Sequence, residues 1–184
     1  MGGSEQEIMK ATYRALCRHG YADLTIEKIA AEYDKGKSLI YYHFDDKDDL
    51  VLSFLDYMED HLEKNYDSSE GEPADRLESL LELALGIENQ EEWEFRKAFI
   101  ELRTQSQHRQ DFREKFREID NMLVSRLEDI MKEAEVQDPE LSADIVASVI
   151  DGAISRKIYS DDREGLERIK KEISRVIFDC REKN

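Results

Sequence analysis

The sequence contains few of the residues that punctuate β-structure, cross-link loops or span membranes. Two prolines and eight glycines among 184 residues are too few for a fold of many hairpins, so an all-α fold is expected. Cys17 and Cys180 are far apart and lie on apolar helical faces, which favours buried free thiols over a disulfide framework or a zinc site. No segment approaches the about 18 uncharged apolar residues that span a bilayer, and residues 1–7 show no secretory signal. We therefore expect a cytoplasmic protein with no membrane partner.

Catalytic and metal-binding patterns are also missing. The four histidines, at positions 19, 43, 61 and 108, are scattered, and none stands in a Glu-x-x-His or His-Glu-x-x-His sequence that would hold a metal. No glycine loop for phosphate and no Gly-x-Ser-x-Gly nucleophile turn occurs. The acidic residues alternate with lysine and arginine at helical spacing, as they do on solvated helix faces. An enzyme, a metal site or a cofactor is therefore not expected.

Residues 25–47 contain a helix-turn-helix pattern. Helical patterns over Ile26–Tyr33 and Lys37–His43 flank a three-residue segment, and Thr25 is placed to cap the first of them. Gly36 allows the sharp turn that separates the two helices. The second helix is too polar and aromatic on one side to be buried, so it can enter a DNA major groove. A helix-loop-helix that arises by chance is the alternative that the spacing alone leaves open.

The order of the residues is more specific than their spacing. The runs that matter are His19-Gly20-Tyr21, Leu24-Thr25-Ile26, Tyr41-Tyr42-His43-Phe44 and the following Lys47-Asp48-Asp49-Leu50. Together they closely resemble the N-terminal DNA-binding head of TetR-family transcriptional regulators. Asp34 and Lys35 depart from that family's pattern, in which a glycine and a small aliphatic residue usually stand. A weaker resemblance, from Phe99 to Gly152, is to the regulatory domain of the branch related to the choline-responsive repressor.

The charge is divided unevenly along the chain. Residues 1–47 hold seven Lys and Arg against eight Asp and Glu, whereas residues 48–184 carry −16 of the net charge of −17. A nearly neutral end and an acidic remainder suit a protein that touches DNA through one end only. We expect a three-helix DNA-binding head over 1–47 and a helical effector-binding and dimerisation domain over 48–184, with about nine helices in all. The acidity fits a high-salt cytoplasm or an ordinary acidic bacterial protein.

Signals for helix ends recur along the chain. Ser4-Glu5-Gln6-Glu7 has the spacing of a capping box, and Gly20 is a natural end for the helix that it opens. Asp45 or Asp46 can cap the helix that follows the head. Pro139 suits the first turn of a later helix.

The second helix of the pattern and its surroundings supply the candidate DNA contacts. Lys37 and Ser38 stand at the start of this helix, where side chains reach base edges, with Leu39 and Tyr42 beside them. The other candidates would position the head on phosphates, although the ring of Tyr41 could instead pack inside the head. The full set is Thr25, Lys28, Lys37, Ser38, Leu39, Tyr41, Tyr42, His43 and Lys47.

The last two helical patterns predict a second interface. The pattern from Pro139 to Tyr159 is apolar on two sides, so it cannot be a simple surface helix. Pairing with a second copy would bury the remaining apolar side in a four-helix bundle. The alternative is a core completed within one chain. The resemblance also implies a homodimer, which would bind double-stranded DNA at an inverted-repeat operator. The candidate interface residues are Ile145, Val149, Gly152, Ile169, Ile173 and Val176.

Aromatic residues are more frequent in the middle of the chain than a tight bundle needs. Ligand sites between bundle helices are mostly apolar with a few polar groups, so we expect a pocket for an apolar or aromatic molecule, although any single one of these side chains is more often core. His61, Arg103 or Asn121 could supply polar groups if they turn inward. The candidate lining residues are Met58, His61, Leu62, Trp93, Phe99, Phe116 and Met122.

Three functions remain open at this point. The first is a dimeric repressor, located at the nucleoid, that a small-molecule effector releases from DNA. The second is a DNA-binding regulator of the same fold without such an effector, controlled by a partner protein or by salt. The third is a helical dimerisation or adaptor protein that does not bind DNA. The lysines and tyrosines of the second helix favour the first two, and a cavity in the middle of the chain would separate these.

Overall fold

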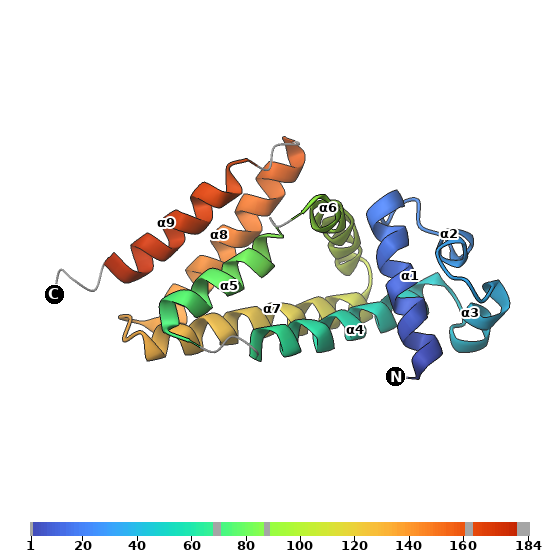
Figure 1. The fold of residues 1–184 in the computed structure, drawn as a ribbon, viewed down its shortest axis with the longest axis horizontal. Coiled ribbons are helices and arrows are strands. Elements are labelled where there is room, and N and C mark those ends of the chain that lie inside the picture. The colour runs from blue at the N-terminus through green and yellow to red at the C-terminus, as the bar shows by residue number, and fades with distance from the viewer. Residues whose placement is uncertain (1, 68–70, 87–88, 161–163, 180–184) are drawn as a thin grey trace. The chain divides into compact units, whose positions relative to one another are not determined.

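The computed structural model describes residues 2–67, 71–86, 89–160 and 164–179. Within these ranges the regular elements are nine α-helices and one short 3-10 helix, with no strand (Figure 1), which confirms the all-α prediction. In chain order they are α1 (Gly3–His19), α2 (Ile26–Ala31), α3 (Lys37–His43), α4 (Lys47–Asp67), α5 (Pro73–Leu85), α6 (Gln90–Thr104), the 3-10 helix η1 (Gln105–Gln107), α7 (Gln110–Glu133), α8 (Pro139–Tyr159) and α9 (Leu166–Asp179).

The helices form two compact units. The first unit consists of residues 1–62 and 91–117, and the second of residues 63–90 and 118–184. Helices α1, α2 and α3 of the predicted head therefore share a unit with the first part of α4, nearly all of α6 and the start of α7. The predicted domain boundary at residue 47 stays a prediction.

Several helix ends lie where the sequence predicts. α1 ends at Gly20, whose φ of +68° is one that other residues rarely adopt. Asp46 accepts hydrogen bonds from the backbone N–H groups of Asp48 and Asp49 at 2.8 and 2.9 Å, which is the capping geometry expected before α4. Pro139 occupies the first turn of α8, where its missing N–H leaves no helical bond unmade.

Two predicted ends differ from the structure. α2 ends at Ala31 rather than Tyr33, because the N–H groups of Glu32 and Tyr33 donate to carbonyls three residues back, at 3.0 and 3.2 Å, and so tighten the last turn beyond α-helical geometry. Ser4 lies inside α1 rather than at its cap, since the helix begins at Gly3 and its cap is Gly2. The predicted capping box would use the carboxylate of Glu7. In the structure the carboxylate of Glu5 instead accepts a hydrogen bond from the backbone N–H of Gly2 at 2.7 Å.

The first unit packs around an apolar core to which α1, α2, α3, α4 and α7 all contribute. α2 contacts both α1 and α3, so α3 is joined to the first helix through α2. Fully burying one large apolar side chain contributes about 1.5–3 kcal/mol, and this unit holds nine of the largest. They are Ile8, Met9, Leu16, Ile29, Ile40, Leu50, Phe54, Leu55 and Phe112.

The second unit is built from mutual contacts among α5, α8 and α9. Leu77, Leu81 and Leu85 of α5 are fully buried in it. Lys170 of α9 is only 5% exposed, and its ammonium lies 2.6 Å from a carboxylate oxygen of Glu82, with two further glutamates within 4 Å. These carboxylates compensate for the loss of water around the charge.

Of the two cysteines, Cys17 is a half-buried free thiol and Cys180 lies outside the described residues. The Sγ of Cys17 is 3.6 Å from the carbonyl oxygen of Glu91, to which it donates. Burial raises the pKa of this thiol to about 11. The thiol is therefore protonated and unreactive at neutral pH.

Candidate nucleic-acid interface

Helix α3 has a buried side and an exposed aromatic side. Ile40 is fully buried, and Phe44 just after the helix is buried as well, so both belong to the core as expected. Tyr41 is 50% exposed and Tyr42 is 81% exposed, and therefore the ring of Tyr41 does not pack inside the head. The ammonium of Lys37 lies 5.2 Å from the centre of the Tyr41 ring. The outward side of α3 thus combines a cation with two phenol groups, all of which can donate hydrogen bonds.

Gly36 forms the turn before α3, and Thr25 caps the start of α2. Gly36 has a φ of +88°, which favours glycine, whereas Asp34 is not among the described residues with positive φ. Lys35 is exposed and takes no part in packing the turn. The Thr25 hydroxyl accepts from the N–H of Lys28 at 3.2 Å, so the predicted cap of α2 is confirmed.

Basic side chains around α3 lie beside glutamates of α1 and α2. Lys37 forms an ion pair with Glu27, and the hydrogen bond from Lys37 holds the pKa of Glu27 below its usual value while raising that of Lys37. Lys35 lies 2.6 Å from Glu7, and Nδ1 of His43 lies 3.5 Å from the carboxylate of Glu5.

Two other candidate lysines are placed differently. Lys28 donates to the backbone carbonyl of Asp23 at 2.7 Å. The ammonium of Lys47 lies 4.4 Å from the centre of the Tyr21 ring, and within the described ranges no carboxylate pairs with it. Ser38 is exposed and Leu39 is half-buried.

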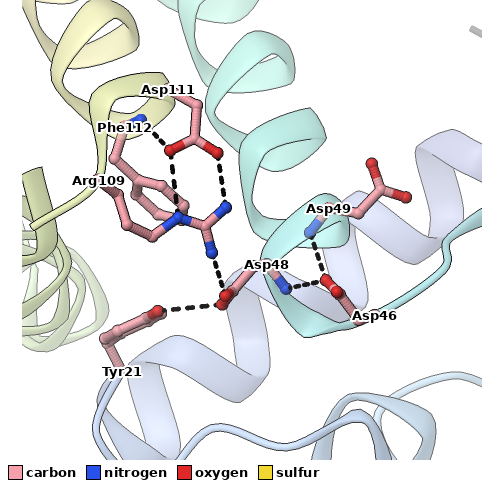
Figure 2. A network of polar contacts seen from close by, with 7 residues as sticks. All are labelled: Tyr21, Asp46, Asp48, Asp49, Arg109, Asp111 and Phe112. Carbon is pink, nitrogen blue, oxygen red and sulfur yellow. Dashed lines mark hydrogen bonds and ion pairs between the residues drawn. The ribbon is translucent and has the colours of Figure 1, made fainter.

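A polar network connects the segment between α1 and α2 with α4 and the start of α7, all within the first unit (Figure 2). The guanidinium of Arg109, just before α7, pairs with Asp48 of α4 and lies 2.5 and 3.1 Å from the carboxylate of Asp111. The hydroxyl of Tyr21, after α1, donates to the same Asp48 carboxylate at 3.4 Å. Burial and then the charge of Asp48 raise the pKa of Tyr21 to about 12, so this hydroxyl remains a donor at neutral pH. The corner between α1 and α2 is thereby connected to α4 and α7.

A second anchor comes from α6. The carboxylate of Glu101 accepts hydrogen bonds from the backbone N–H groups of Tyr21 at 2.8 Å and Ala22 at 3.2 Å. Gly20 makes room for it, because a Cβ at this position would lie 2.9 Å from a Glu101 carboxylate oxygen. Any movement of α6 therefore acts directly on the segment that leads into α2.

Six of the seven predicted ligand-lining residues belong to the first unit, and Met122 belongs to the second. Trp93 and Phe116 are buried, with Phe116 in edge contact with Phe99 at 5.1 Å between ring centres. Met58 and Leu62 are half-buried, and Met122 is half-buried in its own unit. His61 is exposed and stacks on Tyr57 instead of turning inward. The role of these residues in ligand binding stays a prediction.

Helix α8 buries one apolar side and exposes the other. Val146, Ile150 and Ile154 are buried, whereas Ile145 is 54% and Val149 is 42% exposed. A Cβ built on Gly152 would meet open space among the described residues. On α9, Val176 is half exposed, Ile169 is half-buried and Ile173 is buried within its own unit. The predicted interface is therefore available on α8 and at Val176, while Ile173 offers little surface to a partner.

Two family models match the chain. Residues 8–54 match the model described as "Bacterial regulatory proteins, tetR family", which covers the head and the start of α4. Residues 73–179, more than half of the chain, match "BetI-type transcriptional repressor, C-terminal". The chain belongs to the TetR family. Both resemblances predicted from the sequence are thus confirmed.

Curated proteins and solved structures agree with this membership. The HTH-type transcriptional repressor AcnR of Corynebacterium diphtheriae is 26% identical over 170 residues, or 89% of this chain and 86% of that protein. A TetR transcription regulator from Haloarcula marismortui is 35% identical, with a TM-score of 0.83 over 96% of this chain and 97% of that chain. A regulator from Saccharomonospora viridis solved in complex with choline is 20% identical, with a TM-score of 0.79 over 94% of each chain, and it shows the fold alone.

This TetR-family chain is a DNA-binding transcriptional regulator and not an enzyme. The membership rules out the third sequence-based function, that of an adaptor without DNA contact. Among the described residues, no helix has the length and apolarity that a membrane crossing requires.

The sequence did not reveal the anchors of the head. Glu101 lies 80 positions from Tyr21, and Arg109 lies 61 positions from Asp48, so no local pattern connects them. The glutamate partners of Lys35 and Lys37 were signalled indirectly, by the near balance of acidic and basic residues in 1–47. Which lysine each glutamate pairs with became visible only in the fold.

Proposed function

We propose that this TetR-family regulator is a homodimeric repressor that binds an inverted-repeat operator and is released from it by a small apolar or aromatic molecule. The observation that carries the proposal is the exposed side of α3, which presents Lys37, Tyr41 and Tyr42. The opposite side of this helix is buried in the core through Ile40. A helix supported in this way can enter the major groove without uncovering apolar core.

Within this proposal the residues of the head divide into two roles. Lys37 and Ser38, at the start of α3, contact base edges, with Leu39 and Tyr42 alongside. Thr25, Lys28, Tyr41, His43 and Lys47 hold the head on the phosphates. The second group sets affinity for any DNA, whereas the first sets sequence preference.

The homodimer is supported by the exposed apolar side of α8. Ile145, Val149 and the open space at Gly152 follow one another along this side, and Val176 adds exposed surface on α9. A second copy packed on the same surface would bury these groups around a two-fold axis. Two heads related in this way would contact half-sites separated by whole helical turns of about 10–10.5 bp.

The nature of the effector is supported by the aromatic side chains of α6 and α7. The ammonium of Lys97 lies 5.9 Å from the Trp93 ring, and the guanidinium of Arg103 lies 5.8 Å from the Phe116 ring. Ring faces already occupied by the protein's own cations are poor sites for a quaternary ammonium group. An apolar or aromatic ligand is therefore favoured here over a choline-like cation, although choline is bound by the Saccharomonospora viridis protein.

Release from DNA would follow from the anchors of the head. A ligand that displaces α6 moves Glu101, and through it the N–H groups of Tyr21 and Ala22. A ligand that displaces the start of α4 moves Asp48, which Arg109 and Tyr21 both contact. In either case the ligand must bind the non-DNA-binding arrangement more tightly, since equal affinity for both arrangements would shift nothing.

The DNA contacts can be tested by measuring the affinity of Lys37→Ala and Lys47→Ala variants for an operator duplex and for a random duplex of equal length. Lys37→Ala should lose affinity mainly for the operator and so relax sequence preference. Lys47→Ala should weaken binding to both duplexes evenly and lower the salt slope by about one unit for each head. Equal effects of the two substitutions on both duplexes would overturn the assigned roles.

The effector can be tested with a panel of apolar and aromatic compounds, with choline as the cationic comparison. At least one apolar or aromatic compound should raise the melting temperature of the free protein and release it from the operator duplex. Release by choline alone would contradict the proposed ligand class. If salt releases the operator and no compound does, the effector-free regulator becomes the better description.

A further inference from the structure

The basic side chains closest to α3 have glutamate partners in the structure of the protein alone. Lys37 is paired with Glu27, Lys35 with Glu7, and His43 with the carboxylate of Glu5. Glu27 and Lys37 are both well exposed, with 63% and 43% of their side chains accessible. Their pairing is therefore made on the outer surface of the helix-turn-helix and not in its core.

Glu27 is the partner best placed to influence DNA binding. It lies in the first turn of α2, the helix before the turn into α3. Its carboxylate accepts a hydrogen bond from the ammonium of Lys37. The same ammonium lies over the Tyr41 ring. Glu27 thus sets where the charge of Lys37 stands relative to the exposed tyrosine when DNA is absent.

This pairing changes the ion balance of binding. A lysine ammonium that moves from water into the field of the duplex, at a base edge or at a phosphate, displaces about 0.9 of a condensed cation. A lysine that must first leave a carboxylate uncovers a negative charge beside the phosphates, and that charge recruits a cation in turn. The two effects nearly cancel, so such a lysine adds little to the salt dependence of binding.

We propose that Glu27 is a positioning residue of the DNA surface that, by holding Lys37, limits affinity at low salt and makes operator binding less sensitive to salt. The proposal rests on the proposed DNA-binding role of α3. Lys47, which the structure pairs with an aromatic ring and with no carboxylate of the described chain, serves as the internal comparison. Replacing Lys47 should reduce the salt slope by about one unit for each head, and replacing Lys37 should reduce it by clearly less.

The experiment measures the affinity of Glu27→Gln for a labelled operator duplex as a function of potassium chloride concentration. Uncovering Lys37 should strengthen binding about three- to tenfold at low salt and steepen the salt slope by about one unit for each head. The gain should disappear at high salt, where the exposed pair is already screened. Glu172→Gln is the matched control, because it removes the same charge from an exposed ion pair with Arg175 in the other unit.

A double-mutant cycle identifies the cause. In a Lys37→Ala background, Glu27→Gln should have no effect on the salt slope, since there is no longer a lysine to uncover. If the effect persists in that background, Glu27 acts by repelling phosphates directly, and the proposal is wrong. Unchanged or weaker binding by Glu27→Gln alone would also overturn it. Absence of DNA binding by the unsubstituted protein would instead overturn the proposed function itself.

Discussion

Two surfaces of this chain expose large apolar or aromatic groups, and they are built differently. On α3, Tyr41 and Tyr42 are exposed beside Lys37. On α8, the exposed groups are the aliphatic side chains of Ile145 and Val149. Both surfaces lie on helices whose opposite sides are buried, so exposure alone does not distinguish them.

The difference indicates what each surface binds. Phenol hydroxyls and an ammonium can hydrogen-bond to phosphates and base edges, whereas aliphatic groups gain free energy only when another apolar surface covers them. One surface therefore suits DNA and the other suits a second copy of the chain. The two surfaces should also fail independently when they are substituted.

The largest effect is expected from Val149→Glu, which places a charge in the predicted dimer interface. The protein should have the mass of a monomer in sedimentation equilibrium at micromolar concentration. Its operator affinity should fall by about 100-fold or more, because the two heads would no longer bind as a linked pair. Ser79→Glu is the control, since it adds the same charge at an exposed position of α5 in the same unit. A dimeric Val149→Glu protein would show that this surface is not the interface.

Tyr42→Ala removes an exposed group from the other surface. Operator affinity should fall by about 10- to 100-fold, since each dimer loses the contact twice, while the mass of the protein stays that of a dimer. Tyr159 provides a matched control because it is also 81% exposed and lies at the end of α8. Equal losses of operator affinity from Tyr42→Ala and Tyr159→Ala in fluorescence anisotropy titrations would show that the exposed side of α3 does not contact DNA.

The same two surfaces show how far the sequence alone leads. The bounds of α3, the cap at Thr25 and the two-sided pattern of α8 are local properties, and the structure agrees with them. The sequence could not show which apolar side of α8 is covered within the chain, since this depends on how α5 and α9 pack. Ile173 belongs to the predicted interface stripe for the same reason, although the fold buries it within one chain.

Arg109→Ala spares both surfaces and removes a link between α4 and the start of α7 within the first unit. The side chain is about a third exposed, so the free energy of unfolding should fall by only about 1 kcal/mol in urea titrations. Operator affinity should fall a few-fold, because Asp48, which the Tyr21 hydroxyl also contacts, loses its guanidinium partner. Arg175→Ala, which breaks an exposed pair on α9, should leave operator affinity unchanged. If both substitutions weaken operator binding equally, the network does not orient the head.

The smallest effect concerns alkaline stability. The pKa of Tyr21 is raised to about 12 by burial, against about 10 for a tyrosine in an unfolded chain. The folded state therefore keeps a proton that the unfolded state releases, and its stability falls as the pH rises from about 10 to 12. Tyr21→Phe should lose less stability over this interval than the unsubstituted protein in thermal unfolding followed by circular dichroism. An identical alkaline decline in both proteins would contradict the role assigned to this hydroxyl.

The most direct measurement of the two-surface assignment is selection of binding sites from a library of random duplex DNA by the 184-residue protein, followed by sequencing. A dimer that presents two α3 helices should enrich an inverted repeat whose half-sites are separated by whole helical turns of about 10–10.5 bp. Enrichment of a single half-site, or of no sequence at all, would contradict it.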